Sequence, residues 1–441
     1  MDTSREGLLG GFHAFFTEIK AAQGGRNEDP MNPLLPDTCF VPDAEARVMP
    51  DGRLYLYGSW DHPFSDDYCG RVAHCFSTDD MVHFVDHGVI FRNDEEFQGM
   101  PWNPKSSLYA PDAIHRDGKY YYYVCGNHNE EGVAVADSPI GPFSPAEPIV
   151  GADGDSIDPS VFVDDDGQAY YFWGQFTLRG GELMDDMKTL IPDTVKDGIV
   201  TEWEHGFHEG ASIRKRNGKY YMVYTDISRG KATCMSYAIS DHPLGPYKKG
   251  GVIVDNIYCD PASWNDHGSI AEFKGQWYVF YHRSSQNRQT CRRVCVEPIY
   301  FDENGYIQEV EMTSSGAEPA LNLTDGIPAR AACRMMGACY ITLQGDKEIL
   351  VSKKGGHWSM RDWAEYKYLD FGAGERHTFA LTVKGQGSIE VKLEDDTTLC
   401  TLTFDHETPA EATASIPAVS GRHALWLILD GDFEVHSFCV R

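Results

Sequence analysis

The chain has 441 residues, a formal net charge of −29 at pH 7 and an aromatic content of 12%. This length predicts one very large domain or two of ordinary size. The acidic charge argues against nucleic acid as a partner, because phosphate binding needs clustered Lys and Arg. Membrane insertion is not expected either, because no apolar run approaches the roughly 18 residues of a membrane span.

Residues 1–31 are predicted to form a helical lead-in. The segment begins MDTSREGLLGGFHAFF and carries acids at Asp2 and Glu6 without a basic cluster, which makes it a poor secretion signal. The twelve cysteines contain no CxxC pair and are expected to be buried free thiols in a reducing compartment. Together these features predict a cytoplasmic protein.

Residues 32–318 contain a pattern that occurs five times. In EGASIRKRNGKYYMVYTD a short run is followed by Asn217-Gly218 and then by an aromatic run, as in two strands joined by a tight turn. The turn glycines are Gly52, Gly118, Gly167, Gly218 and Gly275. The intervals between them leave room for about four short strands each, which predicts a five-bladed β-propeller.

One polar residue stands six to nine positions before each turn glycine. In chain order these residues are Asp43, Asp112, Asp158, Glu209 and His267. Equivalent positions on the innermost strands of five blades would converge on one funnel near the axis. Any one of these residues could equally be a turn or strand-capping residue, but five in the same register favour a shared site.

Residues 319–329, which include NLTDGIPAR, are interpreted as a linker. Beyond them, residues 330–441 alternate apolar and polar side chains in several short runs, as half-buried strands do. Their number and length are typical of a β-sandwich. The predicted fold class is therefore all-β, a five-bladed β-propeller followed by a β-sandwich.

Several carboxylates in one concave site indicate glycosidic bond cleavage. This reaction needs one acid to protonate the leaving oxygen and one carboxylate on the anomeric side, while a third carboxylate can raise the pKa of the acid by repulsion. Aromatic residues close to the strand heads are candidates for stacking on sugar, although each could equally be a core residue. The predicted sugar contacts are Asp112, Trp60, Tyr109, Trp173, Trp264 and Arg288.

Residues 32–318 resemble glycoside hydrolase family 43. The similar segments are NPLLPDTCFVPDAEARV, YAPDAI, IDPSVFVDDDG, HEGASIRKRNGKYYMVY, NDHGSI and RRVCVEPIYFDENGYIQEVEMTSSG. The resemblance implies a five-bladed propeller that inverts anomeric configuration on arabinose- or xylose-bearing glycans. It also implies that Asp43 is the general base, Asp158 the residue that raises the pKa of the acid, and Glu209 the general acid.

The same resemblance implies further roles and shows some departures. Asp112 would hold the inner part of the site in place, and His267 matches a central histidine that often holds a Ca²⁺ or a water cluster. No other cofactor is expected. The base segment has Pro before Asp43 and not after it, which leaves Asp37 as a rival base. Tyr109 stands where the family usually has Trp, which bears on the wall of the sugar pocket.

Residues 330–441 resemble family 6 carbohydrate-binding modules, on the segments YKYLDFGAGERHTFALTVKGQGSIEVKLED and HALWLILDGDFEVHSFCVR. Trp358 and Trp363 are the candidate sugar-binding aromatics, and a purely supporting role for this part of the chain is the alternative. The sequence does not determine the oligomeric state.

The predicted function is an inverting exo-glycosidase that removes terminal α-L-arabinofuranosyl, or β-D-xylosyl, units from plant-derived oligosaccharides. Inversion predicts that the base and acid carboxyl groups lie roughly 6.5–9.5 Å apart. Two alternatives remain open. One is a related five-bladed enzyme acting on galactofuranosides or fructosides, and the other is a carbohydrate-binding propeller without turnover.

Overall fold

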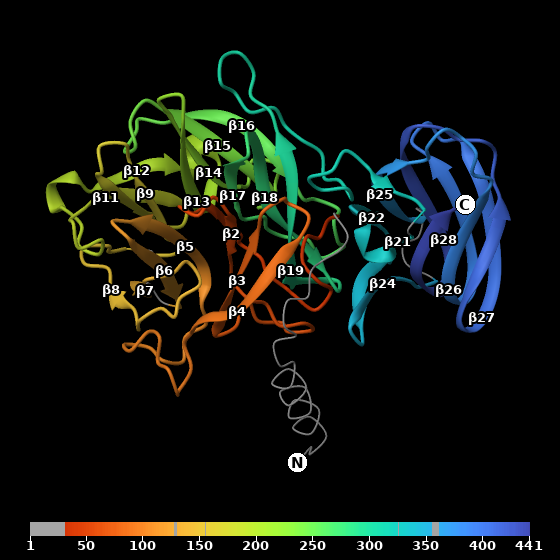
Figure 1. Cartoon of the computed structure of the whole chain (residues 1–441), viewed down its shortest axis with the longest axis horizontal. Coiled ribbons are helices and arrows are strands. Elements are labelled where there is room, and N and C mark those ends of the chain that lie inside the picture. Colours follow the sequence, from red (N-terminus) through yellow and green to blue (C-terminus); the bar gives the residue numbers. More distant parts are fainter. Residues whose placement is uncertain (1–30, 128–129, 155, 325, 355–360) are drawn as a thin grey trace.

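The computed structural model describes residues 31–127, 130–154, 156–324, 326–354 and 361–441. In Figure 1 the N-terminal two thirds of the described chain form a ring of sheets, and the C-terminal third forms a separate sheet region beside it. The helix predicted for residues 1–31 and the candidate Trp358 lie outside the described residues, apart from Met31.

The ring consists of five antiparallel sheets in the described residues, in chain order. The first sheet contains β1 (Glu45–Val48), β2 (Leu54–Tyr57), β3 (Val72–Thr78) and β4 (Phe84–Arg92). The second contains β5 (Tyr109–Arg116), β6 (Lys119–Gly126), β7 (Glu130–Ala136) and β8 (Glu147–Pro148). The third contains β9 (Ser160–Val163), β10 (Ala169–Trp173), β11 (Thr177–Leu183) and β12 (Lys196–Thr201). The fourth contains β13 (Phe207–Arg216), β14 (Lys219–Asp226), β15 (Cys234–Ser240) and β16 (Lys248–Asp255), and the fifth contains β17 (Ser269–Phe273), β18 (Gln276–Ser285) and β19 (Arg288–Ile299).

Each predicted turn glycine joins the first two strands of its sheet, as the repeat indicated. All five glycines have positive φ, from 75° at Gly218 to 87° at Gly167. In the second, fourth and fifth sheets the residue before the glycine also has positive φ, which is the requirement of a two-residue type I′ hairpin. The predicted five-bladed propeller is confirmed.

The ring closes by pairing the start of the described chain with the fifth sheet. The Leu34 amide donates to the Val294 carbonyl at 3.0 Å, and the Val296 amide donates to the Asn32 side chain at 2.9 Å. Ala44 also forms a parallel bridge with Gly268, between the first and fifth sheets. The N-terminal segment therefore lies along the outer edge of β19 and joins the two ends of the ring.

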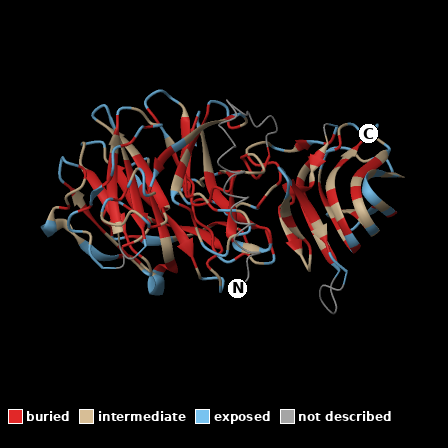
Figure 2. Ribbon diagram, turned by 90° about the horizontal axis from the view of Figure 1, so that it is seen from below, coloured by how far each residue is buried: buried red, intermediate tan, exposed pale blue. Residues whose placement is uncertain are grey.

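The aromatic runs of the repeat fill the space between neighbouring sheets. Tyr122 of β6 lies with its ring centroid 6.0 Å from that of Tyr57 in the first sheet and 5.2 Å from that of Phe143. Figure 2 shows the strands of both parts of the molecule as predominantly buried. Wedge-shaped gaps between twisted sheets need large side chains, which explains why each repeat is so rich in Tyr, Phe and Trp.

The C-terminal strands enclose one hydrophobic core and pair into a single network around β28. In chain order they are β20 (Leu321–Asn322), β21 (Ile327–Pro328), β22 (Arg334–Met336), β23 (Tyr340–Gln344), β24 (Lys347–Ser352), β25 (Asp362–Asp370), β26 (Thr378–Leu393), β27 (Thr398–Ser415) and β28 (Arg422–Val440). The predicted linker 319–329 is not a free connection here. It contributes β20 and β21, because buried Leu321 and Ile327 pair with β25 and β28.

The two parts of the chain share a buried polar interface. Arg293 of β19 forms an ion pair with Glu348 of β24, and both side chains are 1% exposed. Arg330 lies 2.7 Å from the Asp37 carboxylate, and the Glu348 amide donates to the same carboxylate at 2.8 Å. The carboxylate of Asp37, the rival base, is therefore bound by groups of the C-terminal region, and it links that region to the ring.

Replacing Glu348 by Gln should lower the free energy of unfolding by about 3–5 kcal/mol, because it leaves the Arg293 guanidinium buried without its counter-charge. The measurement is the denaturant midpoint and Tm against the wild type. Exposed Glu303 provides the matched control, and Glu303→Gln should shift stability by less than about 0.5 kcal/mol. Equal, small shifts in both variants would contradict a structural role for this ion pair.

Candidate active site

The predicted catalytic residues come from the ends of inner strands on one face of the ring. Asp43 precedes β1, Asp158 precedes β9, and Glu209 lies near the start of β13. His267, which precedes β17, has its Nδ1 3.7 Å from an Asp43 oxygen and 4.0 Å from an Asp158 oxygen. The amide of Gly210 donates to Asp158 at 3.0 Å. Residues far apart in the sequence are thus brought into one site.

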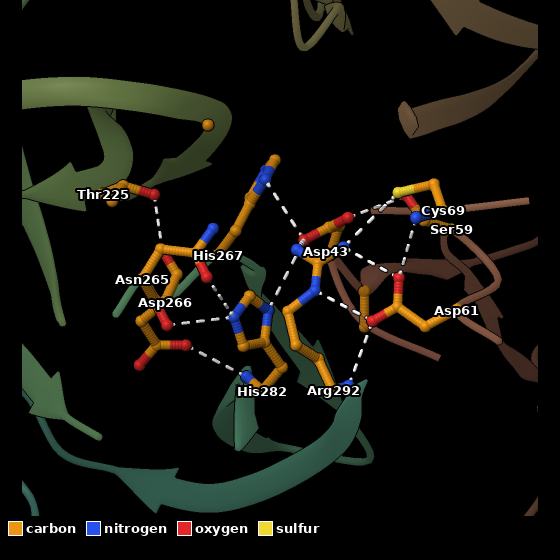
Figure 3. A network of polar contacts seen from close by, with 12 residues as sticks. Asp43, Ser59, Asp61, Cys69, Thr225, Asn265, Asp266, His267, His282 and Arg292 are labelled. Carbon is orange, nitrogen blue, oxygen red and sulfur yellow. Dashed lines mark hydrogen bonds and ion pairs between the residues drawn. The ribbon is translucent and has the colours of Figure 1, made fainter. Parts of the chain in front are cut away.

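Asp43 is held as an ion by basic neighbours. It is 5% exposed, and it accepts hydrogen bonds from Arg292 Nη1 at 2.8 Å and Ser59 Oγ at 2.7 Å. His282 Nδ1 lies 3.4 Å away (Figure 3). Burial alone would raise the pKa of Asp43, but the Arg292 guanidinium, followed by His282 and His267, holds that pKa well below its usual range. The carboxylate is therefore available to accept a proton at neutral pH.

The position of Arg292 is set by a second carboxylate. Arg292 donates from Nε and Nη2 to the two oxygens of Asp61 at 2.9 and 3.0 Å (Figure 3). Its guanidinium carbon lies 4.8 Å from the Tyr68 ring centroid. Sequence reasoning did not identify Arg292, Asp61, Tyr68 or His282 as site residues. A signal existed for Arg292, since two adjacent arginines, Arg292 and Arg293, stand directly before the apolar strand run VCV.

Asp158 has the opposite electrostatic setting from Asp43. It is also 5% exposed, but it accepts a hydrogen bond from the Gly210 amide, and the carboxyl groups of Glu209 and Asp43 lie close enough to repel it. Burial, followed by repulsion from Glu209 and Asp43, raises the pKa of Asp158 well above its usual range. Both aspartates have a φ of 56°, a left-handed conformation that is uncommon outside glycine and typical of strained functional positions.

Glu209 is half-buried and accepts a hydrogen bond from Gln175 Nε2 at 2.8 Å. The following Gly210 has a φ of 71°, and a Cβ placed there would lie 2.8 Å from His267 Cδ2 and 2.9 Å from Thr225 Oγ1. Only glycine fits this close approach. The Glu-Gly pair therefore lets the chain pass close to His267 and Asp158, while the Glu209 side chain stays partly exposed.

Asp112 ties inner strands together and does not line an open surface. It is fully buried, lies 2.6 Å from Arg47 Nη2 of β1, and accepts the Val161 amide of β9 at 2.7 Å. Burial raises the pKa of Asp112 to about 6, although the Arg47 guanidinium opposes this shift. This placement supports the holding role predicted for Asp112 and moves it out of the set of direct sugar contacts.

The remaining predicted sugar contacts are placed differently from one another. Trp173 is fully buried in the core, and its Nε1 donates to the Asp153 carbonyl at 3.0 Å, so it has no surface to offer a sugar. Trp60 is half-buried and stacks on His74 with 3.9 Å between ring centroids. Tyr109 is half-buried, Trp264 is 47% exposed, and Arg288 forms an ion pair with Asp66.

The residues around His267 do not fit a directly bound calcium. Ca²⁺ takes six to eight oxygen ligands, whereas the carboxylates nearest His267 are already engaged with Arg292 and the Gly210 amide. Among the described residues there is no group of three or more His, Cys, Asp or Glu side chains that could hold a metal ion. Hydrolysis by paired carboxylates requires only water as the second reactant, and no cofactor is needed.

The described part of the chain contains no helix long and apolar enough to cross a membrane.

Comparisons with known proteins identify the family. The model of "Glycosyl hydrolases family 43" matches residues 31–307. A xylosidase/arabinosidase from Thermoclostridium stercorarium is 32% identical over 91% of this chain and 96% of that relative.

Solved structures extend this likeness. The structure of a β-xylosidase/α-arabinofuranosidase from a compost microbial metagenome, in complex with xylotriose, is 31% identical and has a TM-score of 0.56; the match covers 65% of this chain and 98% of that one. An arabinoxylan arabinofuranohydrolase from Bacillus subtilis shares the fold over 93% of this chain and 97% of its own, with a TM-score of 0.55 at 23% identity. This protein therefore belongs to glycoside hydrolase family 43.

Proposed function

We propose that this glycoside hydrolase removes terminal α-L-arabinofuranosyl or β-D-xylosyl units from plant-derived oligosaccharides with inversion of configuration. The observation that carries the proposal is the electrostatic contrast within one site, where Asp43 is held ionised by Arg292 while Asp158 is pushed toward its protonated form beside Glu209. The names of the relatives, which include xylosidase/arabinosidase, support pentose units as the sugars released.

The proposed mechanism needs three carboxyl groups and one water. Asp43 removes a proton from the water as its oxygen attacks the anomeric carbon. Glu209 gives its proton to the leaving oxygen as the glycosidic bond breaks, which leaves a free hydroxyl on the released chain. Asp158 adjoins Glu209 through the Gly210 amide, and repulsion between the two carboxyl groups opposes their both being ionised.

We propose that Trp60, Tyr109, Trp264 and Arg288 contact the sugar; the partial exposure of all four side chains supports this role. In the C-terminal region we propose carbohydrate binding at the exposed side of Trp363, which is half-buried and packs against Trp426 with 4.5 Å between ring centroids. Binding of xylan to the wild type but not to Trp363→Ala would test this second role.

The function is tested with nitrophenyl glycosides of α-L-arabinofuranose, β-D-xylose and β-D-galactofuranose, with the product anomer followed by NMR. We expect hydrolysis of at least one of the two pentosides, with the first-formed sugar inverted. Exclusive hydrolysis of the galactofuranoside would assign the enzyme to the alternative substrate. Retention of configuration, or binding without any turnover, would overturn the proposed mechanism.

A further inference from the structure

Two large aromatic side chains are exposed on the segments that adjoin Glu209. Trp203 is 95% exposed and Phe176 is 47% exposed. A tryptophan that gains almost no burial on folding contributes little to stability, and exposed aromatic side chains close to a site are typical of ligand contacts. Neither residue was identified from the sequence.

Phe176 is linked directly to the residue that holds the proposed acid. β10 ends at Trp173, and the connection to β11 lies on the same face of the ring as the catalytic carboxylates. Gln175 in this connection donates to Glu209 at 2.8 Å. The Phe176 amide donates to the His208 carbonyl at 2.7 Å, and the two rings lie 5.1 Å apart.

The backbone of Phe176 is in an unfavourable conformation. Its φ is 62°, in the left-handed region that a bulky residue seldom adopts. Such a conformation costs of order 1–3 kcal/mol and persists only where the surrounding structure maintains it, most often at functional sites. Most phenylalanine side chains are buried in the core. The strained backbone of Phe176 instead turns its ring toward solvent, next to Gln175, which contacts Glu209.

Trp203 is presented by a short helix fixed against the same connection. This helix, α2 (Glu202–His205), is capped by the Thr201 side chain, which accepts the Glu204 amide, and it ends at Gly206 with a φ of 78°. The Glu202 amide donates to the Phe176 carbonyl at 2.9 Å. The backbone that carries Trp203 is therefore hydrogen-bonded to Phe176, while its own side chain takes no part in holding it there.

We propose that Phe176 and Trp203 form a binding surface for the part of the glycan that remains attached to the leaving oxygen. This inference rests on the proposed function of Glu209. A general acid must contact the leaving oxygen, so the departing chain has to extend past Glu209 over its neighbouring segments. The flat apolar faces of its sugar units would stack on the two rings, and binding energy from these non-reacting units would lower the barrier at the reacting bond.

The test compares Trp203→Ala with the wild type on two substrates that share the terminal sugar identified by the glycoside panel. One is the nitrophenyl glycoside and the other is an oligosaccharide of four sugar units. We expect the ratio of kcat/KM for the oligosaccharide to kcat/KM for the nitrophenyl glycoside to fall about 10-fold in the variant, which corresponds to the loss of about one stacking contact. Because Trp203 is almost fully exposed, Tm should not change.

The matched control is Tyr300→Ala. Tyr300 is 56% exposed and directly follows β19, whose end lies on the face of the ring opposite to the catalytic carboxylates. This variant should leave the ratio unchanged. Phe176→Leu is the second variant, and it should lower the ratio in the same direction while keeping an apolar side chain at the strained position.

A binding measurement separates failure of this inference from failure of the proposed function. Calorimetry with the four-unit oligosaccharide in a Glu209→Gln background does not depend on turnover, and adding Trp203→Ala should raise its Kd about 10-fold. If the wild type binds without cleaving and the variant binds more weakly, the surface is supported and the hydrolase function is not. An unchanged ratio together with an unchanged Kd would overturn the binding surface while leaving the catalytic assignment intact.

Discussion

Glu209→Gln is expected to lower kcat/KM on natural oligosaccharides by about 10²–10⁴-fold, because the departing sugar hydroxyl can no longer receive a proton as the bond breaks. The loss on nitrophenyl glycosides should be smaller, since nitrophenolate leaves without protonation. The fold should be preserved, because the amide can still interact with Gln175. The measurement is kcat/KM on both substrate types together with Tm.

Glu272→Gln provides the control for this experiment. Glu272 lies exposed on β17, an inner strand of the same ring, and its replacement should leave both kinetic values unchanged. A Glu209→Gln variant that loses activity equally on oligosaccharides and nitrophenyl glycosides would contradict the role of general acid, because the effect would then not depend on the leaving group.

The single variant Asp43→Asn is expected to lower kcat by about 10²–10⁴-fold or more on both oligosaccharides and nitrophenyl glycosides. The attacking water loses its base whatever the leaving group is. KM should change little, because Asn has nearly the same shape and Arg292 remains bound to Asp61. The comparison of kcat for the two substrate types thus distinguishes the base from the acid.

The same variant has a pH-dependent effect on stability. The pKa of Asp43 is lowered in the folded state, so its ionised form stabilises the protein above the unfolded pKa of about 3.9, and this contribution is lost as the pH falls through the folded pKa. The stability difference between wild type and Asp43→Asn should therefore be largest near neutral pH and shrink below about pH 4. Denaturant unfolding at a series of pH values measures it.

Asp37→Asn tests the rival assignment of the base. Asp37 is engaged by Arg330 and the Glu348 amide at the interface between the two parts of the chain, so this variant should lose stability and retain kcat. Loss of kcat without loss of stability would instead favour Asp37 over Asp43 as the general base.

Some features of this structure are set by residues that are neighbours in the sequence, and these could be predicted from the sequence. The tight turns follow from Asx-Gly and Lys-Gly pairs between short runs, and the positive φ of Asn217 and Gly218 depends on those residues alone. Repetition of this local unit was enough to predict the propeller and to place Asp43, Asp158 and Glu209 at equivalent strand heads.

Other features depended on contacts between distant segments. Trp173 and Trp60 have the same residue type and similar positions in their repeats, yet Trp173 is fully buried in the core and Trp60 stacks half-buried on His74. The supposed linker pairs with strands at the end of the chain. Which side chains are exposed in a ring is set by the neighbouring sheet, and the sequence of one repeat does not contain that information.

By itself, the sequence determined the repeating hairpin and the order in which the three proposed catalytic carboxylates occur along it, because backbone turns and strand alternation are short-range properties. Only the tertiary structure decided that Arg292, which Asp61 holds in place, keeps Asp43 ionised, and that Phe176 and Trp203 are exposed. The charge state of a buried carboxylate depends on the fields of groups brought within a few ångströms by ring closure. Those groups are separated from Asp43 by up to 249 residues of chain.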